Sequence, residues 1–147
     1  MIAALYFVLT AIAAPISFGP VQFRISEALV ILPGFFFAAV PGVSVGCFLA
    51  NLLLGAALPD VIFGTLATVI GAFGSYALRK SPKLVCIPPI VSNMIIIPIV
   101  LRYAYGAEDM LWFMAVTVGI GEVLAVAVLG NLLAAALGKY APQLLKE

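Results

Sequence analysis

The sequence consists almost entirely of apolar runs that are separated by short breaks containing polar residues, glycine or proline. Across its 147 residues the chain is 65% hydrophobic and only 9% charged. Such runs suit the apolar core of a bilayer, which is ~30 Å thick, whereas a soluble domain of this size needs more polar surface. The pattern therefore predicts an all-α polytopic membrane protein, with residues 1–147 in a single integral membrane domain.

Six apolar runs are expected to form six transmembrane helices. The first three are shorter than the ~20 residues that a full crossing takes, so a count of four or five spans also stays open. The first run has no basic segment before it and leads into Pro15, and we interpret it as a span rather than a cleaved signal. The expected spans are residues 2–14, 25–37, 43–54, 61–78, 84–105 and 110–137.

The distribution of basic residues predicts the orientation, because cytoplasmic loops carry an excess of Lys and Arg. With six spans, the loop after the fourth span and the C-terminal tail lie on one side of the membrane. That side then holds five basic residues against two. We therefore expect a multi-pass protein of the cell membrane with both termini in the cytoplasm. The five are Arg79, Lys80, Lys83, Lys139 and Lys146, and the two are Arg24 and Arg102.

Composition argues against several functions. The formal net charge of +1 gives no footprint for nucleic acid, and the absence of His removes the commonest metal ligand. Cys47 and Cys86 lie in different apolar runs and are interpreted as packing residues. The sequence holds no P-loop for ATP. We expect a transport component, not an enzyme, with no catalytic residue, metal or cofactor, driven by an ion gradient or by partner proteins.

A polar stretch interrupts the apolar chain after the first span. Pro15, Gly19 and Pro20 break the helix there, so Gln22 and Arg24 are expected at a non-helical turn.

Ser26 is expected to cap the following helix, with Glu27 in its first turn, where the helix dipole favours a carboxylate. Because polar groups are costly to bury in such a chain, we interpret this stretch as the rim of a ligand site. The alternative is a water-exposed loop in which Arg24 and Glu27 pair.

Glu122 is the most informative ionisable residue within a span. It lies twelve residues after Met110, which is about 18 Å along an α-helix and close to mid-membrane. Ionisable residues at that depth are functional by default. Asn51 and Asn93 are neutral companions that we expect to face a pocket holding Glu27 and Glu122, with hydrogen bonding between helices as the alternative.

Further polar and aromatic residues lie near the expected outer side. Asp60 is interpreted either as a helix cap or as a functional group, and Arg102 as a residue that extends to the membrane surface. Carboxylates, amides and aromatic rings together suit a small flat ligand with several N–H donors. The aromatic residues expected near the pocket are Phe18, Phe23, Tyr103 and Trp112.

Small residues recur at helix-packing spacing, as at Gly42, Gly46 and Ala50. Such faces let membrane helices approach closely. We interpret them as packing within the bundle, with docking to a second membrane protein as the alternative.

Five segments of the chain carry a resemblance to a known family. They are APISFGPVQFRISEAL (residues 14–29), ANLLLG (50–55), PDVIFGTLAT (59–68), PPIVSN (88–93) and VGIGE (118–122). In order and spacing they resemble the QueT family, whose members are substrate-binding S components of energy-coupling factor (ECF) transporters assigned to the uptake of queuosine precursors. The resemblance implies a six-transmembrane-helix S-component bundle, a pocket open to the outside, and partnership with a transmembrane coupling subunit and two cytoplasmic ATPases.

The resemblance also implies a ligand of the 7-deazaguanine class. One carboxylate would accept the paired N–H groups of the guanine edge and another would suit a cationic aminomethyl arm, so Glu122 and Glu27 are expected to take these roles in either order. The remaining contacts are expected from Asn51, Asn93 and Gln22 as hydrogen-bonding groups, from Arg24 at the ligand carbonyl or at Glu27, and from Phe18 or Phe23 as a stacking lid.

Two other functions stay open at this point. One is an S component for a different base or vitamin. The other is a small proton-coupled transporter that uses Glu122 as its carrier carboxylate.

Overall fold

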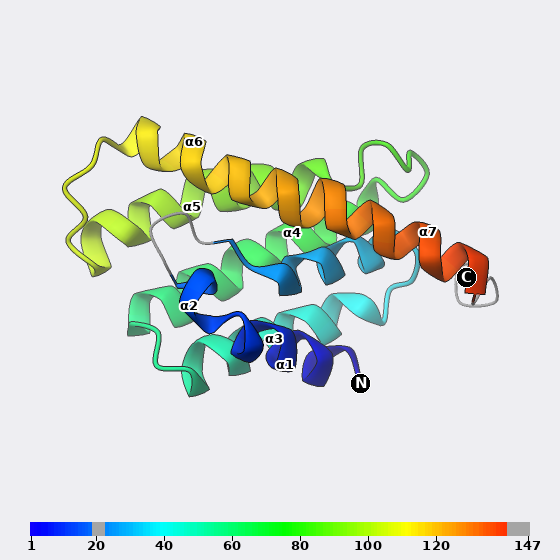
Figure 1. Cartoon of the computed structure of the whole chain (residues 1–147). Coiled ribbons are helices and arrows are strands. Elements are labelled where there is room, and N and C mark those ends of the chain that lie inside the picture. The colour runs from blue at the N-terminus through cyan, green and yellow to red at the C-terminus, as the bar shows by residue number, and fades with distance from the viewer. Residues whose placement is uncertain (19–22, 141–147) are drawn as a thin grey trace.

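The structure is a computed structural model that describes residues 1–18 and 23–140, and this part of the chain is helical without strands (Figure 1). In chain order the elements are α1 (Ile2–Ile12), α2 (Ala14–Ser17), η1 (Ile25–Gly34), α3 (Ala39–Leu53), η2 (Asp60–Gly64), α4 (Thr65–Ala77), α5 (Ile87–Ala104), α6 (Leu111–Glu122), η3 (Val123–Gly130) and α7 (Asn131–Tyr140). The expected all-α class is confirmed, and each of the six apolar runs contains helix.

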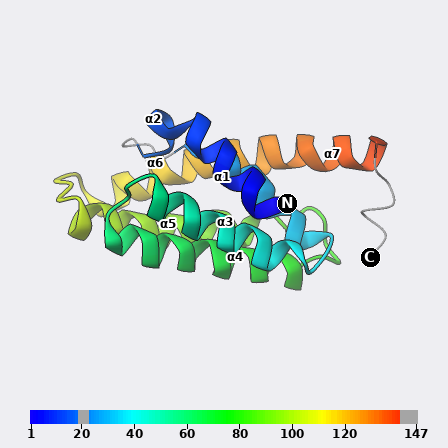
Figure 2. The same ribbon diagram turned by 90° about the horizontal axis from the view of Figure 1, so that it is seen from below.

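Three helices are long and apolar enough to cross a membrane: Asp60–Ala77, Ile87–Ala104 and Leu111–Lys139. The last consists of α6, η3 and α7 in one line, and we call it the C-terminal rod. Shorter apolar helices occupy Ile2–Ile12, Ile25–Gly34 and Ala39–Leu53, as the short first runs of the sequence led us to expect. Figure 2 shows the longer helices running along one common direction, with α1 inclined to them.

Helix η1 forms the centre of the bundle. It packs against α1, α3, α4, η3 and α7, and all its residues from Ser26 to Gly34 are buried. It is a 3₁₀-helix, which rises about 2.0 Å per residue instead of 1.5 Å. Its ten residues therefore reach about 20 Å through the interior, about 5 Å further than an α-helix of the same length.

The expected capping role of Ser26 is wrong. Helix η1 begins at Ile25, preceded by Arg24, and no side chain caps it. Ser26 is fully buried, and its hydroxyl is instead hydrogen-bonded to Thr10 Oγ1 on α1 at 2.7 Å. Ser26 therefore ties η1 to α1.

Irregular helix surrounds the three buried carboxylates. Glu27 lies in the first turn of η1, Asp60 begins the π-helical segment η2, and Glu122 is followed directly by the π-helical segment η3. Such π segments are frequent at functional sites, because they widen the helix and change the direction of the side chains. The backbone is thus least regular where the interior is most acidic.

The small residues of α3 pack inside the bundle. A Cβ at Gly46 would lie 2.6 Å from the Cβ of Tyr6 and 3.0 Å from the Ala3 backbone on α1. Glycine is therefore what lets α1 and α3 approach so closely, as small residues do between membrane helices. This contact also fixes the height of Tyr6 in the bundle.

Replacing Gly46 with Val is expected to destabilise the protein by about 1–3 kcal/mol, because the added side chain overlaps α1. The check is the thermal unfolding midpoint of the purified protein in detergent, which will fall. Val45→Leu adds bulk at the neighbouring exposed position and is the control, with no expected change. An unaltered midpoint in Gly46→Val would contradict the close contact of α1 with α3.

Candidate functional site

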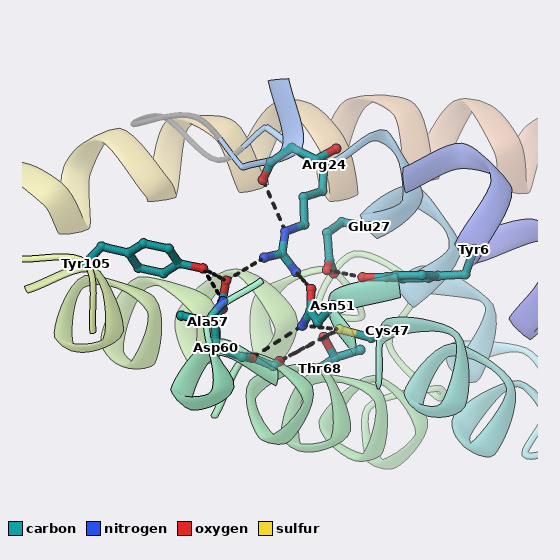
Figure 3. A network of polar contacts seen from close by, with 11 residues as sticks. Tyr6, Arg24, Glu27, Cys47, Asn51, Ala57, Asp60, Thr68 and Tyr105 are labelled. Carbon is teal, nitrogen blue, oxygen red and sulfur yellow. Dashed lines mark hydrogen bonds and ion pairs between the residues drawn. The ribbon is translucent and has the colours of Figure 1, made fainter. Parts of the chain in front are cut away.

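Arg24 connects three parts of the chain (Figure 3). It is extended, with φ −108° and ψ 109°, and only 4% exposed. Its Nε donates to the Ser17 carbonyl oxygen at 3.4 Å and its Nη1 donates to Asn51 Oδ1 at 3.2 Å, while Nη2 lies 3.5 Å from Asp60 Oδ2. A guanidinium with several donors in fixed directions can hold α2, α3 and η2 together in this way.

Asp60 is the charge partner of this guanidinium and is fully buried. Its Oδ2 also accepts a hydrogen bond of 3.1 Å from the Tyr105 hydroxyl, which itself accepts one of 3.0 Å from the Ala57 backbone N–H. Partial burial raises the pKa of the Tyr105 phenol above its ordinary value, so this hydroxyl keeps its proton at neutral pH. Asn51 Nδ2 donates to the Asp60 carbonyl oxygen at 3.3 Å, which turns its Oδ1 toward Arg24.

These contacts exclude the alternative of a water-exposed loop in which Arg24 pairs with Glu27. Both side chains are buried, and the carboxylate that forms the ion pair with Arg24 is Asp60. The interpretation of Asp60 as a helix cap is likewise wrong, because it makes no capping hydrogen bond at the start of η2.

Glu27 lies on the other side of Arg24 from Asp60 and is hydrogen-bonded to Tyr6. The Tyr6 hydroxyl donates to Glu27 Oε1 at 2.5 Å, and the two side chains are 0% and 1% exposed. Tyr6 lies in α1, and Glu27 lies at the start of η1, so the bond joins two helices. Figure 3 shows Tyr6 reaching Glu27 from one side while Arg24 descends from above.

Glu27 and Glu122 share a small cavity between η1, α5 and the C-terminal rod. Its volume is about 10 Å³, close to what one water molecule occupies. Besides the two carboxylates it is lined by Arg24, Asn93, Ile97 and Val118.

Three buried polar atoms at this cavity have no hydrogen-bond partner in the part of the chain that the structure describes. They are Glu27 Oε2, Glu122 Oε2 and Asn93 Nδ2. A buried polar atom without a partner costs free energy, so such atoms are rare and cluster where another molecule supplies the partner. Two acceptors and one donor without partners therefore belong to residues that line the same small space.

Comparison with known proteins identifies the family. The family model described as QueT transporter matches residues 1–139. This chain belongs to the QueT transporter family. The family is one of transporters and not of enzymes, which agrees with the expectation from the sequence.

A curated relative matches part of this QueT-family chain. The protein named queuosine precursor transporter QueT, from Lactococcus lactis subsp. cremoris (strain MG1363), is 39% identical over 72 residues. The match covers 48% of this chain and 42% of that relative, so it spans less than half of either protein. No solved structure matches the chain.

The structure of this QueT-family chain brings four of the predicted site residues to the cavity: Arg24, Glu27, Asn93 and Glu122. Asn51 was expected to face the same pocket but does not line it, and instead accepts a hydrogen bond from Arg24 and donates one to the Asp60 carbonyl oxygen. The roles of these five residues in binding a ligand stay predictions.

The expected aromatic lid is placed only in part. The Phe18 ring is half-buried, and its centroid lies 5.3 Å from the guanidinium carbon of Arg24. Phe23, which directly precedes Arg24 in the sequence, is also half-buried. Gln22 lies outside the described residues. Tyr103 and Trp112 are 79% and 66% exposed and do not line the cavity, so the expectation that they lie near it is wrong.

Two tyrosines of the network were not among the predicted site residues. Tyr6 and Tyr105 each donate to a buried carboxylate. A signal for Tyr6 was present, because a phenol inside an apolar span requires a hydrogen-bond partner when it is buried. Tyr105 carries no such signal, since it follows the end of α5 near the surface.

Removing one member of the buried ion pair is expected to destabilise the fold. Arg24→Gln leaves Asp60 without its cation, and Asp60→Asn leaves Arg24 without its anion, each at a cost of about 3–5 kcal/mol. The double variant removes both charges, so its loss will be smaller than the sum of the single losses. Thermal unfolding in detergent measures the three values.

Arg102→Gln is the control for the loss of an arginine, because Arg102 is exposed. It is expected to change the midpoint little. Additive losses in the double variant would show that Arg24 and Asp60 do not depend on each other.

Proposed function

We propose that this chain is the substrate-capture subunit of an ATP-driven ECF importer and that it binds a queuosine precursor of the 7-deazaguanine class from the outside. The observation that carries the proposal is the pair of buried carboxylates, Glu27 and Glu122, each with an oxygen that lacks a partner among the described residues. Carboxylate oxygens accept hydrogen bonds and donate none when ionised. The cavity therefore favours a ligand rich in N–H donors.

The balance of charge supports a cationic ligand. Arg24 forms its ion pair with Asp60. Glu27 and Glu122 add two further carboxyl groups beside this one cation. An ammonium group on the ligand would offset one of these carboxylates in a site where charges are weakly screened. A 7-aminomethyl-7-deazaguanine offers this ammonium together with adjacent N–H donors on its ring, and Asn93 Nδ2, which has no partner among the described residues, would donate to its carbonyl oxygen.

The size of the cavity indicates how binding must proceed. Pockets for small molecules measure about 300–1,000 Å³, whereas this cavity holds about 10 Å³. A heterocycle therefore enters only if η1, α5 and the C-terminal rod separate. Part of the gross binding energy is spent on this opening.

The proposed partners are those of an ECF importer, and the family and the sequence support them without showing them. The relative from Lactococcus lactis is named a queuosine precursor transporter, and the QueT family model covers residues 1–139 of this chain. The sequence holds no P-loop, so ATP hydrolysis belongs to other subunits. A transmembrane coupling subunit and two cytoplasmic ATPases would supply it, at the side where the excess of Lys and Arg leads us to expect the termini.

Glu122→Gln is expected to weaken binding of 7-aminomethyl-7-deazaguanine to the purified chain by about 1–3 kcal/mol, because a charge-assisted hydrogen bond in a buried site is lost. Calorimetry in detergent measures the affinity, with guanine and several vitamins as competing ligands. Glu108→Gln is the control, since Glu108 is exposed and outside the cavity.

Three results separate the possible ligands. Tight binding of the 7-deazaguanine with weak binding of guanine supports the proposal. Binding of another heterocycle instead would retain a substrate-capture role and discard the queuosine precursor. An unchanged affinity in folded Glu122→Gln protein would remove Glu122 from the site.

Transport is expected only when the chain is reconstituted with its coupling subunit and ATPases and supplied with ATP. The measurement is uptake of labelled ligand into proteoliposomes. The control is the chain alone under a pH gradient, which should give no uptake. Uptake under that gradient without ATPases would favour the proton-coupled alternative that uses Glu122.

A further inference from the structure

Tyr6 makes a contact that neither the family nor the proposed function explains. Its side chain is fully buried in α1 and does not line the cavity. It nevertheless donates to one oxygen of Glu27, while the other oxygen of the same carboxylate lies at the cavity without a partner among the described residues. The phenol thus lies behind Glu27, on the side away from the expected ligand.

We propose that Tyr6 is a positioning residue for ligand recognition: it binds Glu27 Oε1 and thereby presents Glu27 Oε2 to the cavity as a hydrogen-bond acceptor. This inference rests on the proposed binding of a ligand at Glu27 and Glu122. A carboxylate on a flexible stem has several rotamers, and one bond from a rigid aromatic side chain fixes which oxygen points where. Fixing the carboxylate before the ligand binds reduces the conformational entropy that is lost on binding.

The geometry of α1 makes Tyr6 a rigid support. Gly46 on α3 lies so close to α1 that a side chain there would overlap the Cβ of Tyr6, and the Thr10 hydroxyl, one turn later, is hydrogen-bonded to the Tyr6 carbonyl oxygen and to Ser26. The hydroxyl therefore has little freedom to follow Glu27 if that side chain turns. Selectivity for an N–H donor at this point of the ligand would then depend on a residue that the ligand does not touch.

An amide in place of the carboxylate exposes this role. In Glu27→Gln the amide oxygen accepts the Tyr6 hydroxyl, because the phenol hydrogen would otherwise lose its acceptor. The amide NH₂ group is then turned into the cavity, where it meets an N–H donor of the ligand. Because Tyr6 holds the amide oxygen, the substitution puts a donor where the wild type presents an acceptor. Ligand binding is then weakened both by the lost charge and by the two donors that face each other.

The test is a double-mutant cycle on binding of 7-aminomethyl-7-deazaguanine, measured by calorimetry. Tyr6→Phe alone is expected to weaken binding about 10-fold, and Glu27→Gln alone about 100-fold. In the double variant Tyr6→Phe/Glu27→Gln the amide is free to turn its oxygen to the ligand, so binding is expected to be about 10-fold tighter than in Glu27→Gln. If Tyr6 only supported the fold, adding Tyr6→Phe to Glu27→Gln would not improve ligand binding.

Ser75→Ala is the control. It removes a buried hydroxyl of α4 that donates to the Val85 carbonyl oxygen and that neither contacts Tyr6 nor lines the cavity, and it is expected to lower the unfolding midpoint but to leave the Glu27→Gln affinity unrescued. If the double variant binds no better than Glu27→Gln while the wild type binds, the role of Tyr6 is overturned and the proposed function stands. If the folded wild type binds no 7-deazaguanine, the proposed function is overturned and this inference with it.

Discussion

The ion pair between Arg24 and Asp60 is the constraint on which the rest of the interior depends. A guanidinium buried in an apolar bundle is tolerated only with a carboxylate beside it and its remaining donors satisfied. Asp60 supplies the charge, and Ser17 and Asn51 accept two of the donors. Asp60 is the carboxylate that forms the ion pair with Arg24, while Glu27 and Glu122 line the cavity beside it.

The irregular helices and the acidic residues belong to one arrangement. A regular α-helix would place its side chains at fixed intervals, whereas the 3₁₀ form of η1 stretches the central segment and the π forms of η2 and η3 widen their turns. Glu27, Asp60 and Glu122 lie at these changes of helix type. The carboxylates of three separate segments can therefore point inward around one guanidinium.

Much of the fold was predictable from the apolar runs, because helices buried in lipid need only length and hydropathy. The shared location of Glu27, Asn93 and Glu122 followed from the cost of polar groups at mid-membrane. The partner of Arg24 did not, since Asp60 lies 36 positions later and reaches Arg24 only after α3 folds back. The helix types were also missed, because they arise from packing between elements and leave no mark in local composition.

The C-terminal rod is longer than the apolar core of a bilayer is thick. From Leu111 to Lys139 it has 29 residues, about 44 Å of helix, against an apolar core of ~30 Å. Within it Glu122 is the one charged residue before Lys139, so a rod of this length is accommodated by tilt or by a thicker bilayer around it. The depth of the Glu122 carboxylate is then set jointly by the chain and by the thickness of the bilayer around it.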